Sequence, residues 1–187
     1  SDGLNLIWTT DWSTVPLREV VIADQTGGEP VNVITYPGTE GGGHRGLDLT
    51  SDDGTIVFVK NDPRSIYKID RNPIGVMTLI AGKGSCCYLT VDGNGASAVF
   101  DYPDQVILAA DDRTAYVSTS PNIRIVDIVT GDVTTLAGDA SSSRERSLQD
   151  GVGSSARMNE PKGMSLSSKI ATLVCLLSRN IDPIASM

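Results

Sequence analysis

The chain has 187 residues, of which 40% are hydrophobic, enough to bury the core of one domain. The formal net charge is −8, and Lys and Arg are scattered along the sequence. We expect no nucleic-acid partner, because phosphate binding requires clustered basic residues. No apolar run approaches the ~18 residues of a membrane span, so we expect no such span. Many Asp, with 19 Gly and 9 Pro, favour strands joined by tight turns.

The first forty residues predict three short strands separated by turn-forming residues: 4–10, 18–23 and 31–36. The third run ends at Pro37-Gly38, a position that Ala-Gly occupies later in the chain. We interpret residues 1–40 as a degenerate first copy of a repeated unit.

Two longer stretches each predict four strands in hairpin order. In the first stretch the strands are 47–49, 55–59, 65–70 and 76–82, and in the second they are 105–109, 114–118, 123–128 and 133–138. A third copy begins at Pro161 and then loses the pattern.

A twelve-residue phrase, D-G-x-G-x-x-A-x-Φ-x-x-P with Φ a large apolar residue, occurs at 92–103 and again at 150–161. Each copy follows a run that ends in Ala-Gly. Recurrence every 56 to 58 residues indicates one supersecondary unit used several times.

The fixed positions of this phrase are expected to be structural. Glycine supplies backbone conformations that other residues avoid, and Asp can bond the backbone of a turn. Alanine leaves room where chain segments approach closely, and proline suits the entry to a strand. These positions are Gly82, Asp92, Gly93, Gly95, Ala98, Pro103, Gly138, Asp150, Gly151, Gly153, Ala156 and Pro161.

The pattern closely resembles the NHL-repeat family of β-propellers. The motifs that carry the resemblance are Thr134-Thr135-Leu136-Ala137-Gly138, Asp150-Gly151-x-Gly153-x-x-Ala156 and Pro161-x-Gly163. The resemblance covers roughly residues 46–167. Two features depart from the family pattern: Gln105 replaces the usual glycine after the proline, and the third copy lacks the usual Tyr-Val-Ala-Asp strand.

The resemblance implies an all-β fold, a partial β-propeller of four-stranded antiparallel blades. The expected blades are a degenerate first blade at 1–40, a second with its connector at 41–102, a third with its connector at 103–160, and an incomplete fourth blade or divergent tail at 161–187. Because propellers have ~4–8 blades, such an arc leaves an apolar blade face without a neighbour.

The family's members mostly bind proteins or other ligands on the faces of the disc, and a few relatives are metal-dependent lyases or hydrolase-like enzymes. We therefore expect a non-catalytic module for protein–protein interaction, or a structural component of a larger assembly, with other protein chains covering the open blade face. The alternative is a fragment of a propeller-type hydrolase or lyase whose catalytic blades are missing. A sensor for a small molecule or glycan on the disc face also fits the sequence.

One alternative concerns calcium. Asp92, Asn94 and Asp101 resemble an oxygen-rich calcium loop, but the second copy has Val152 and Asn159 in the matching places. We therefore predict structural turns and no cofactor, and keep a calcium site at those three residues as the alternative.

Candidate catalytic residues are scarce. His44 is the single histidine and is expected to lie in the Gly-rich joint that starts at 41–43, whereas a metal-dependent lyase would need several histidines. Nothing in the sequence places a Ser-His-Asp triad together. We expect no enzymatic activity, with His44 as a surface or packing residue, and we expect Trp8 and Trp12 to pack within the fold.

The cysteine pattern does not assign the protein to an oxidising or a reducing compartment. Cys86 and Cys87 are adjacent and bridge each other poorly, so one of them pairs with Cys175 or all three are free. The few Lys and abundant Asp, Ser and Gly lean toward the secretory route. The chain has no Asn-x-Ser/Thr acceptor and no even set of cysteines, which leaves the localisation unassigned.

Overall fold

The structure, a computed structural model, describes residues 4–8, 18–22, 32–36, 43–71, 73–82, 84, 89–139, 148–167 and 172–177. These residues form antiparallel β-sheets, and their helical elements are two short 3-10 helices. None of the helices in these ranges is long and apolar enough to cross a membrane. The all-β class expected from the sequence is confirmed.

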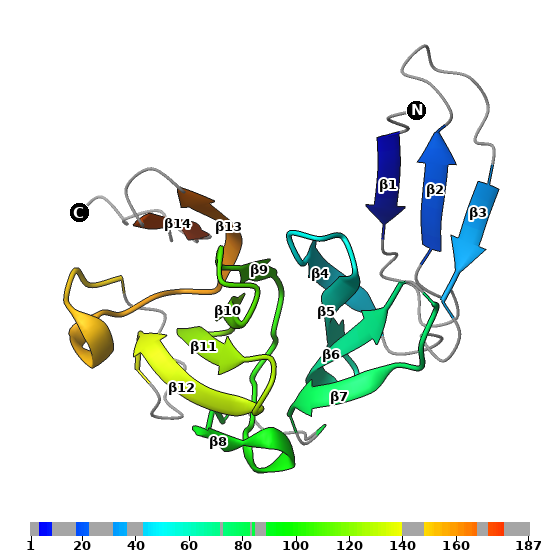
Figure 1. Ribbon diagram of the computed structural model, residues 1–187. Coiled ribbons are helices and arrows are strands. Elements are labelled where there is room, and N and C mark those ends of the chain that lie inside the picture. Colours follow the sequence, from blue (N-terminus) through cyan, green and yellow to red (C-terminus); the bar gives the residue numbers. More distant parts are fainter. Residues whose placement is uncertain are drawn as a thin grey trace.

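Four sheets follow one another along the chain (Figure 1). The first contains β1 (Leu4–Trp8), β2 (Arg18–Ile22) and β3 (Asn32–Thr35). The second contains β4 (His44–Leu49), β5 (Thr55–Asn61), β6 (Arg64–Asp70) and β7 (Thr78–Ala81). The third has the order β8-β12-β11-β10-β9, with β8 (Gly93–Asn94), β9 (Val106–Leu108), β10 (Thr114–Ser118), β11 (Ile123–Asp127) and β12 (Asp132–Ala137). The fourth contains β13 (Pro161–Ser167) and β14 (Thr172–Leu177).

Most strands lie where the alternating apolar pattern predicts them, with two differences. The pair Gly93–Asn94 was expected to lie in a tight turn, but it forms β8 and pairs with β12. The placement of His44 in a joint was wrong, because His44 begins β4 and pairs with Lys60. A bulge between His44 and Leu47 interrupts the alternation, so the sequence pattern marks this strand only from Leu47 onward.

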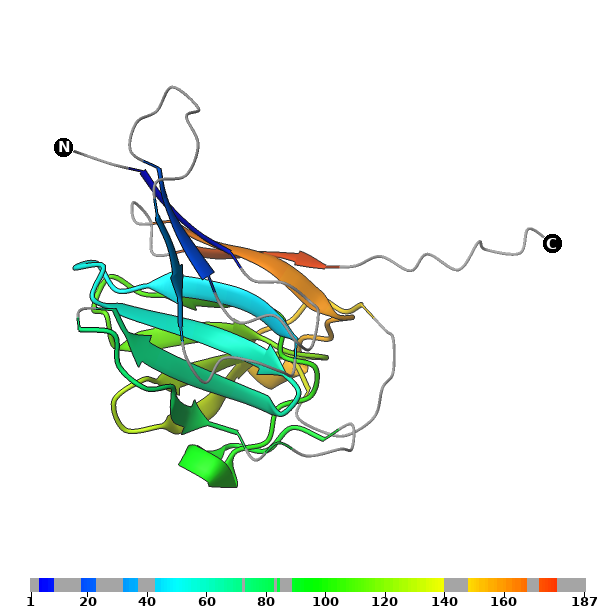
Figure 2. The ribbon, with the colours of Figure 1, turned by 90° about the vertical axis from the view of Figure 1, so that its right-hand side faces the viewer.

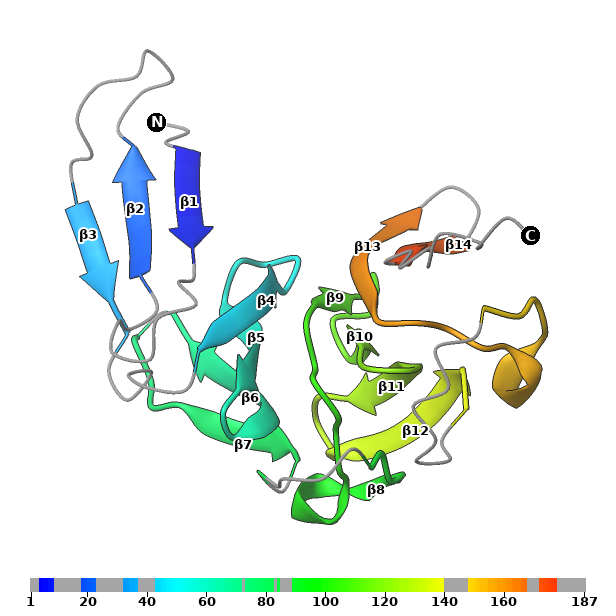
Figure 3. The ribbon, with the colours of Figure 1, turned by 180° about the vertical axis from the view of Figure 1, so that it is seen from behind.

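The sheets stand side by side in an open arc (Figures 1 and 3). On the inner side of the arc β4 meets β9, where the Gly46 N–H donates to the Asp104 carbonyl at 2.7 Å. A Cβ on Gly46 would lie 2.5 Å from the Gln105 Cα, so only glycine permits this approach. In the view from the side, the second and third sheets are stacked one behind the other (Figure 2).

The main hydrophobic core lies between the second and third sheets. Its members are apolar residues of both sheets and of the loop between them, among them Val57, Val59, Ile66, Ile80, Ala98, Phe100, Val106, Val117 and Val126. On the opposite face of β5, Ile56 and Phe58 pack with Tyr36 and Ile69 in a second cluster. Because successive side chains of a strand point to opposite faces, β5 is buried on both sides.

Aspartate side chains bond the backbone of the turns between strands. In the β11–β12 turn, Asp127 Oδ1 accepts hydrogen bonds from the Val129 and Thr130 N–H groups at 2.8 and 3.0 Å. Asp127 Oδ2 forms an ion pair with Arg113 at 2.7 Å. The Thr130 N–H, together with the weaker effects of Val129 and Arg113, lowers the pKa of Asp127 from 3.8 to about 2.

This shift predicts a pH dependence. Because the pKa of Asp127 is lower in the folded chain than in the unfolded chain, its ionised form stabilises the fold above pH 4, and this contribution is lost as the pH falls toward 2. Asp127→Asn should therefore flatten the pH dependence of the free energy of unfolding between pH 4 and pH 2, measured by urea denaturation. Val129→Ser keeps both backbone donors and should retain the slope of the unmodified chain; a slope unchanged by Asp127→Asn would contradict the assignment.

Glycines at the sheet junctions give a second prediction. Gly82 has φ +111°, and a Cβ there would lie 2.7 Å from the Arg64 carbonyl oxygen, whereas Gly95 has φ +52° and open space around its Cα. We expect Gly82→Ala to destabilise the fold by about 3 kcal/mol, from backbone strain plus steric overlap, and Gly95→Ala by about 1 kcal/mol from strain alone. Chemical denaturation measures both; equal losses would show that the close approach at Gly82 is unimportant.

Candidate functional site

The two copies of the repeated phrase form equivalent loops between sheets. Each contains a one-turn 3-10 helix, η1 (Gly95–Ser97) and η2 (Gly153–Ser155). The Gly82 N–H donates to the Gly95 carbonyl at 3.1 Å, and the Gly138 N–H donates to the Gly153 carbonyl at the same distance. Gly95 N–H also donates to the Gly131 carbonyl at 2.9 Å. The first loop thus joins the outer strand of one sheet to the outer strand of the next.

Other fixed positions of the phrase lie in tightly packed surroundings. Ala98 and Ala156 are buried, and so are Pro103 and Pro161, which lead into β9 and begin β13. A Cβ on Gly93 would lie 3.2 Å from the Ser97 carbonyl carbon, and one on Gly151 would lie 2.7 Å from that of Ser155.

Asp92 holds a buried arginine. Arg124 of β11 is fully buried, and its Nη2 donates to Asp92 Oδ1 at 2.5 Å. Asp92 also accepts hydrogen bonds from the Thr135 N–H and hydroxyl, at 3.1 and 2.9 Å. The Arg124 guanidinium lies 5.5 Å from the centre of the Phe100 ring. Burial lowers the pKa of Arg124, and the Asp92 carboxylate opposes this effect.

The three candidate calcium ligands, Asp92, Asn94 and Asp101, all bond to other groups of the protein. Asp92 Oδ1 is bonded to Arg124, Asp101 Oδ1 accepts from Arg64 Nη1 at 2.6 Å, and Asn94 Nδ2 donates to the Thr130 carbonyl at 2.8 Å. Two of the three candidate ligands therefore already face a guanidinium. Within the described part of the chain, no group of three or more His, Cys, Asp or Glu residues could hold a metal ion.

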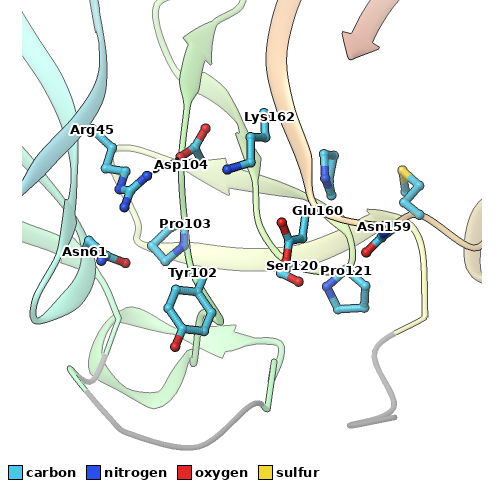
Figure 4. A pocket seen from close by; sticks show the side chains of 12 residues that line it. Arg45, Asn61, Tyr102, Pro103, Asp104, Ser120, Pro121, Asn159, Glu160 and Lys162 are labelled. Carbon is cyan, nitrogen blue, oxygen red and sulfur yellow. Dashed lines mark hydrogen bonds and ion pairs between the residues drawn. The ribbon is translucent and has the colours of Figure 1, made fainter. Parts of the chain in front are cut away.

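A pocket of about 280 Å³ opens between loops of the second, third and fourth sheets (Figure 4). Arg45 of β4 and Asn61 at the end of β5 line one side. The segment that leads into β9 contributes Tyr102 and Asp104, and the β10–β11 turn contributes Ser120. Residues 158–162, at and before the start of β13, close the opposite side. The pocket is therefore built where the connecting loops of successive sheets converge.

One ion pair lines this pocket and a second lies beside it. Arg45 Nη1 contacts Asp104 Oδ1 at 3.0 Å, across the boundary between the second and third sheets. Arg64 Nη1 contacts Asp101 Oδ1 at 2.6 Å, with both side chains almost buried. The Arg64 guanidinium also stacks over the Tyr102 ring, 3.9 Å from its centre. This stacking fixes the aromatic ring at the pocket.

Two residues of the pocket share an unusual backbone conformation. Tyr102 has φ +41° and Glu160 has φ +46°, and they occupy the same position in the two copies of the phrase. Non-glycine residues rarely adopt this left-handed region, and they do so more often at functional sites. Neither residue was predicted from the sequence, because the predicted positions are those that the two copies share. The sequence signal that marks these pocket residues is a position next to the fixed proline at which the two copies carry different side chains.

The other singled-out residues lie elsewhere. His44 is 2% exposed, and its ring centre lies 5.5 Å from that of Phe58, so it packs in the fold. Cys175 lies on β14, and its partial burial raises the pKa of its thiol. The backbone of Trp8 ends β1. The expectations for Trp12, Cys86 and Cys87 concern positions outside the described residues.

Comparison with known protein families gives no match, and no curated protein matches the chain. The structure is similar to an auxiliary nutrient binding protein from Bacteroides ovatus, with 20% identity and a TM-score of 0.66 over 86% of this chain and 42% of that protein. A protein of the same description from Bacteroides thetaiotaomicron shows 20% identity and a TM-score of 0.67 over 91% and 42%. A Bacteroides thetaiotaomicron protein of unknown function shows 20% identity and a TM-score of 0.63 over 83% and 38%. The chain spans about two-fifths of these proteins and shares their fold.

The Asp92–Arg124 pair gives a prediction that also tests the calcium alternative. Asp92→Ala leaves a buried guanidinium without its carboxylate, so we expect a loss of about 1–3 kcal/mol in the free energy of unfolding. Arg113→Ala removes a solvent-exposed ion pair and should cost less than about 1 kcal/mol. Thermal unfolding with and without millimolar CaCl₂ provides the measurement; a calcium-dependent rise in Tm that Asp92→Ala abolishes would favour the calcium site instead.

Proposed function

We propose that the four sheets are successive blades of a partial NHL-type β-propeller, and that the chain is a non-catalytic binding module that operates against other protein chains in a larger assembly. The observation that carries this proposal is an apolar face on the C-terminal side of the third sheet. The equivalent face of the second sheet is covered by its neighbour.

The propeller arrangement is supported by two equivalent junctions. The Gly82–Gly95 and Gly138–Gly153 hydrogen bonds recur 56 to 58 residues apart with the same length. The second sheet consists of four antiparallel strands in chain order, as propeller blades do. The inner strands β4, β9 and β13 face one another on the concave side of the arc (Figure 3).

Equivalent residues of the two full sheets differ in exposure. Ile80 of β7 is 6% exposed because the third sheet covers it, whereas its counterpart Leu136 of β12 is 39% exposed. Asn94 is exposed but bonds to the Thr130 carbonyl in the β11–β12 turn, whereas its counterpart Val152 is apolar and 91% exposed. Val152 is the N-cap of η2, which contacts β12. We call Leu136 and Val152 the open face.

A grouped apolar surface on a soluble domain is typical of an interaction site. The equivalence with Ile80 indicates the occupant, since this covered counterpart packs against another β-sheet. Two of the similar structures are described as auxiliary nutrient binding proteins, which agrees with a non-catalytic binding role. The matched part is 42% or less of each of those proteins, so additional structure adjoins it there.

The proposal predicts association through the open face. We expect the 19.7 kDa chain to exceed its monomer mass in light scattering at about 50–100 μM, or to bind a hydrophobic dye strongly, because exposed apolar surface drives both. The double variant Leu136→Ser/Val152→Ser should lower both signals several-fold without a comparable change in thermal unfolding.

Val129→Ser is the matched control, since Val129 is 68% exposed in the β11–β12 turn and outside the open face. It should leave association and dye binding unchanged. A monodisperse 19.7 kDa monomer that binds no dye would overturn the proposed use of this face.

A further inference from the structure

We infer that the pocket between the second, third and fourth sheets binds a neutral polyhydroxylated ligand, namely one unit of a carbohydrate. The inference does not depend on the open face, because the pocket is lined by other residues. Its volume of about 280 Å³ is close to the lower end of small-molecule pockets, ~300–1,000 Å³, which suits a single sugar ring better than an extended ligand.

The charges of the pocket balance, which favours an uncharged ligand. Arg45 and Lys162 supply two positive charges, and Asp104 and Glu160 supply two negative charges. In Figure 4 the Arg45 side chain points toward Asp104, in agreement with their 3.0 Å contact, and the Lys162 amine also lies on the Asp104 side. An anion would meet the two carboxylates, and a cation would meet the two basic groups. Hydroxyl groups can bond to both kinds of side chain.

Flat apolar surfaces border these polar groups. The Tyr102 side chain is 42% exposed, and its ring is fixed by the Arg64 guanidinium on one face. The rings of Pro103 and Pro121 also line the pocket (Figure 4). A sugar ring has apolar C–H faces and a polar edge, so it can pack against such surfaces while its hydroxyls bond to the surrounding side chains.

The pocket also contains an unused acceptor. The Asn61 side-chain oxygen is buried and has no hydrogen-bond partner among the described residues. In Figure 4 this oxygen points toward Tyr102 and Pro103, and Ser120 faces the pocket from the other side. A buried acceptor without a partner is unfavourable, and a ligand O–H or N–H group would satisfy it if the Asn61 amide turned into the pocket.

The backbone at Tyr102 and Glu160 supports a site that the fold maintains for binding. Both residues line the pocket, and both have left-handed φ values, +41° and +46°. A conformation that costs about 1–3 kcal/mol at each non-glycine residue persists where surrounding contacts enforce it. Here it directs two different side chains, an aromatic ring and a carboxylate, to neighbouring walls of one pocket.

The test uses the full chain and defined probes. D-glucose, D-galactose, D-mannose and maltose are each titrated and followed by saturation-transfer NMR and calorimetry, with inorganic phosphate and glycine as charged and zwitterionic comparisons. We expect at least one saccharide to bind saturably and more tightly than phosphate or glycine. Asn61→Ala should weaken that binding about tenfold, as the loss of one hydrogen bond would, and Tyr102→Ala should weaken it further.

Val129→Ser and the open-face variant Leu136→Ser serve as controls and should leave saccharide binding unchanged, so the two proposals can fail separately. If Asn61→Ala alters the far-UV spectrum or lowers Tm, Ser120→Ala takes its place as the pocket variant. The inference is overturned if phosphate or glycine binds in preference to every saccharide, if no probe binds, or if saccharide binding survives in the pocket variants.

Discussion

The second sheet is buried on both faces because it packs against the third sheet on one side and against Tyr36, which follows β3, on the other. β5 shows the constraint directly: Val57 and Val59 face the third sheet, and Ile56 and Phe58 face the opposite way toward Tyr36. No helical layer covers these faces in the described chain. A sheet in such an array depends on its neighbours for its core, so cohesion is a property of the junctions rather than of any one sheet.

The junctions explain which positions of the repeat are fixed. Gly82 and Gly138 pass close to the backbone of their own sheets, at Arg64–Ser65 and Pro121–Asn122, and their N–H groups bond to the loop that follows. Asp92 bonds to Arg124 and Thr135 of the third sheet. These roles tolerate little change. A Cβ on either glycine would overlap with backbone atoms, and loss of the Asp92 carboxylate would leave the buried Arg124 guanidinium without its partner. Tyr102 and Glu160, the positions before the fixed prolines, differ between the two copies and line the pocket.

The strands could be predicted from the sequence because the signals for each strand are local. The alternation of apolar and polar residues and the Asp- or Gly-rich turns that bound it lie within a few residues of one another. The candidate pocket could not, because its contacts join residues far apart, such as Arg45 with Asp104 and Arg64 with Asp101. The burial of Arg124 escaped for the same reason, and for His44 the sequence left packing and surface positions as alternatives. The surroundings of both residues come from neighbouring strands and loops, which a one-dimensional pattern does not contain.

Gln105 shows how a departure from the repeat can be accommodated. Gly46 in the second sheet and Gly163 in the fourth occupy the corresponding place, and at Gly46 the approach of β9 leaves no room for a side chain. The Gln105 amide instead accepts from the Met164 N–H at 2.6 Å and donates to the Met164 carbonyl at 3.3 Å. The side chain thus bonds to the backbone of β13 in the way a neighbouring strand would. The junction between the third and fourth sheets is therefore held by a side chain where the preceding junction is held by the backbone, and this places β13, and Lys162 on it, at the edge of the pocket.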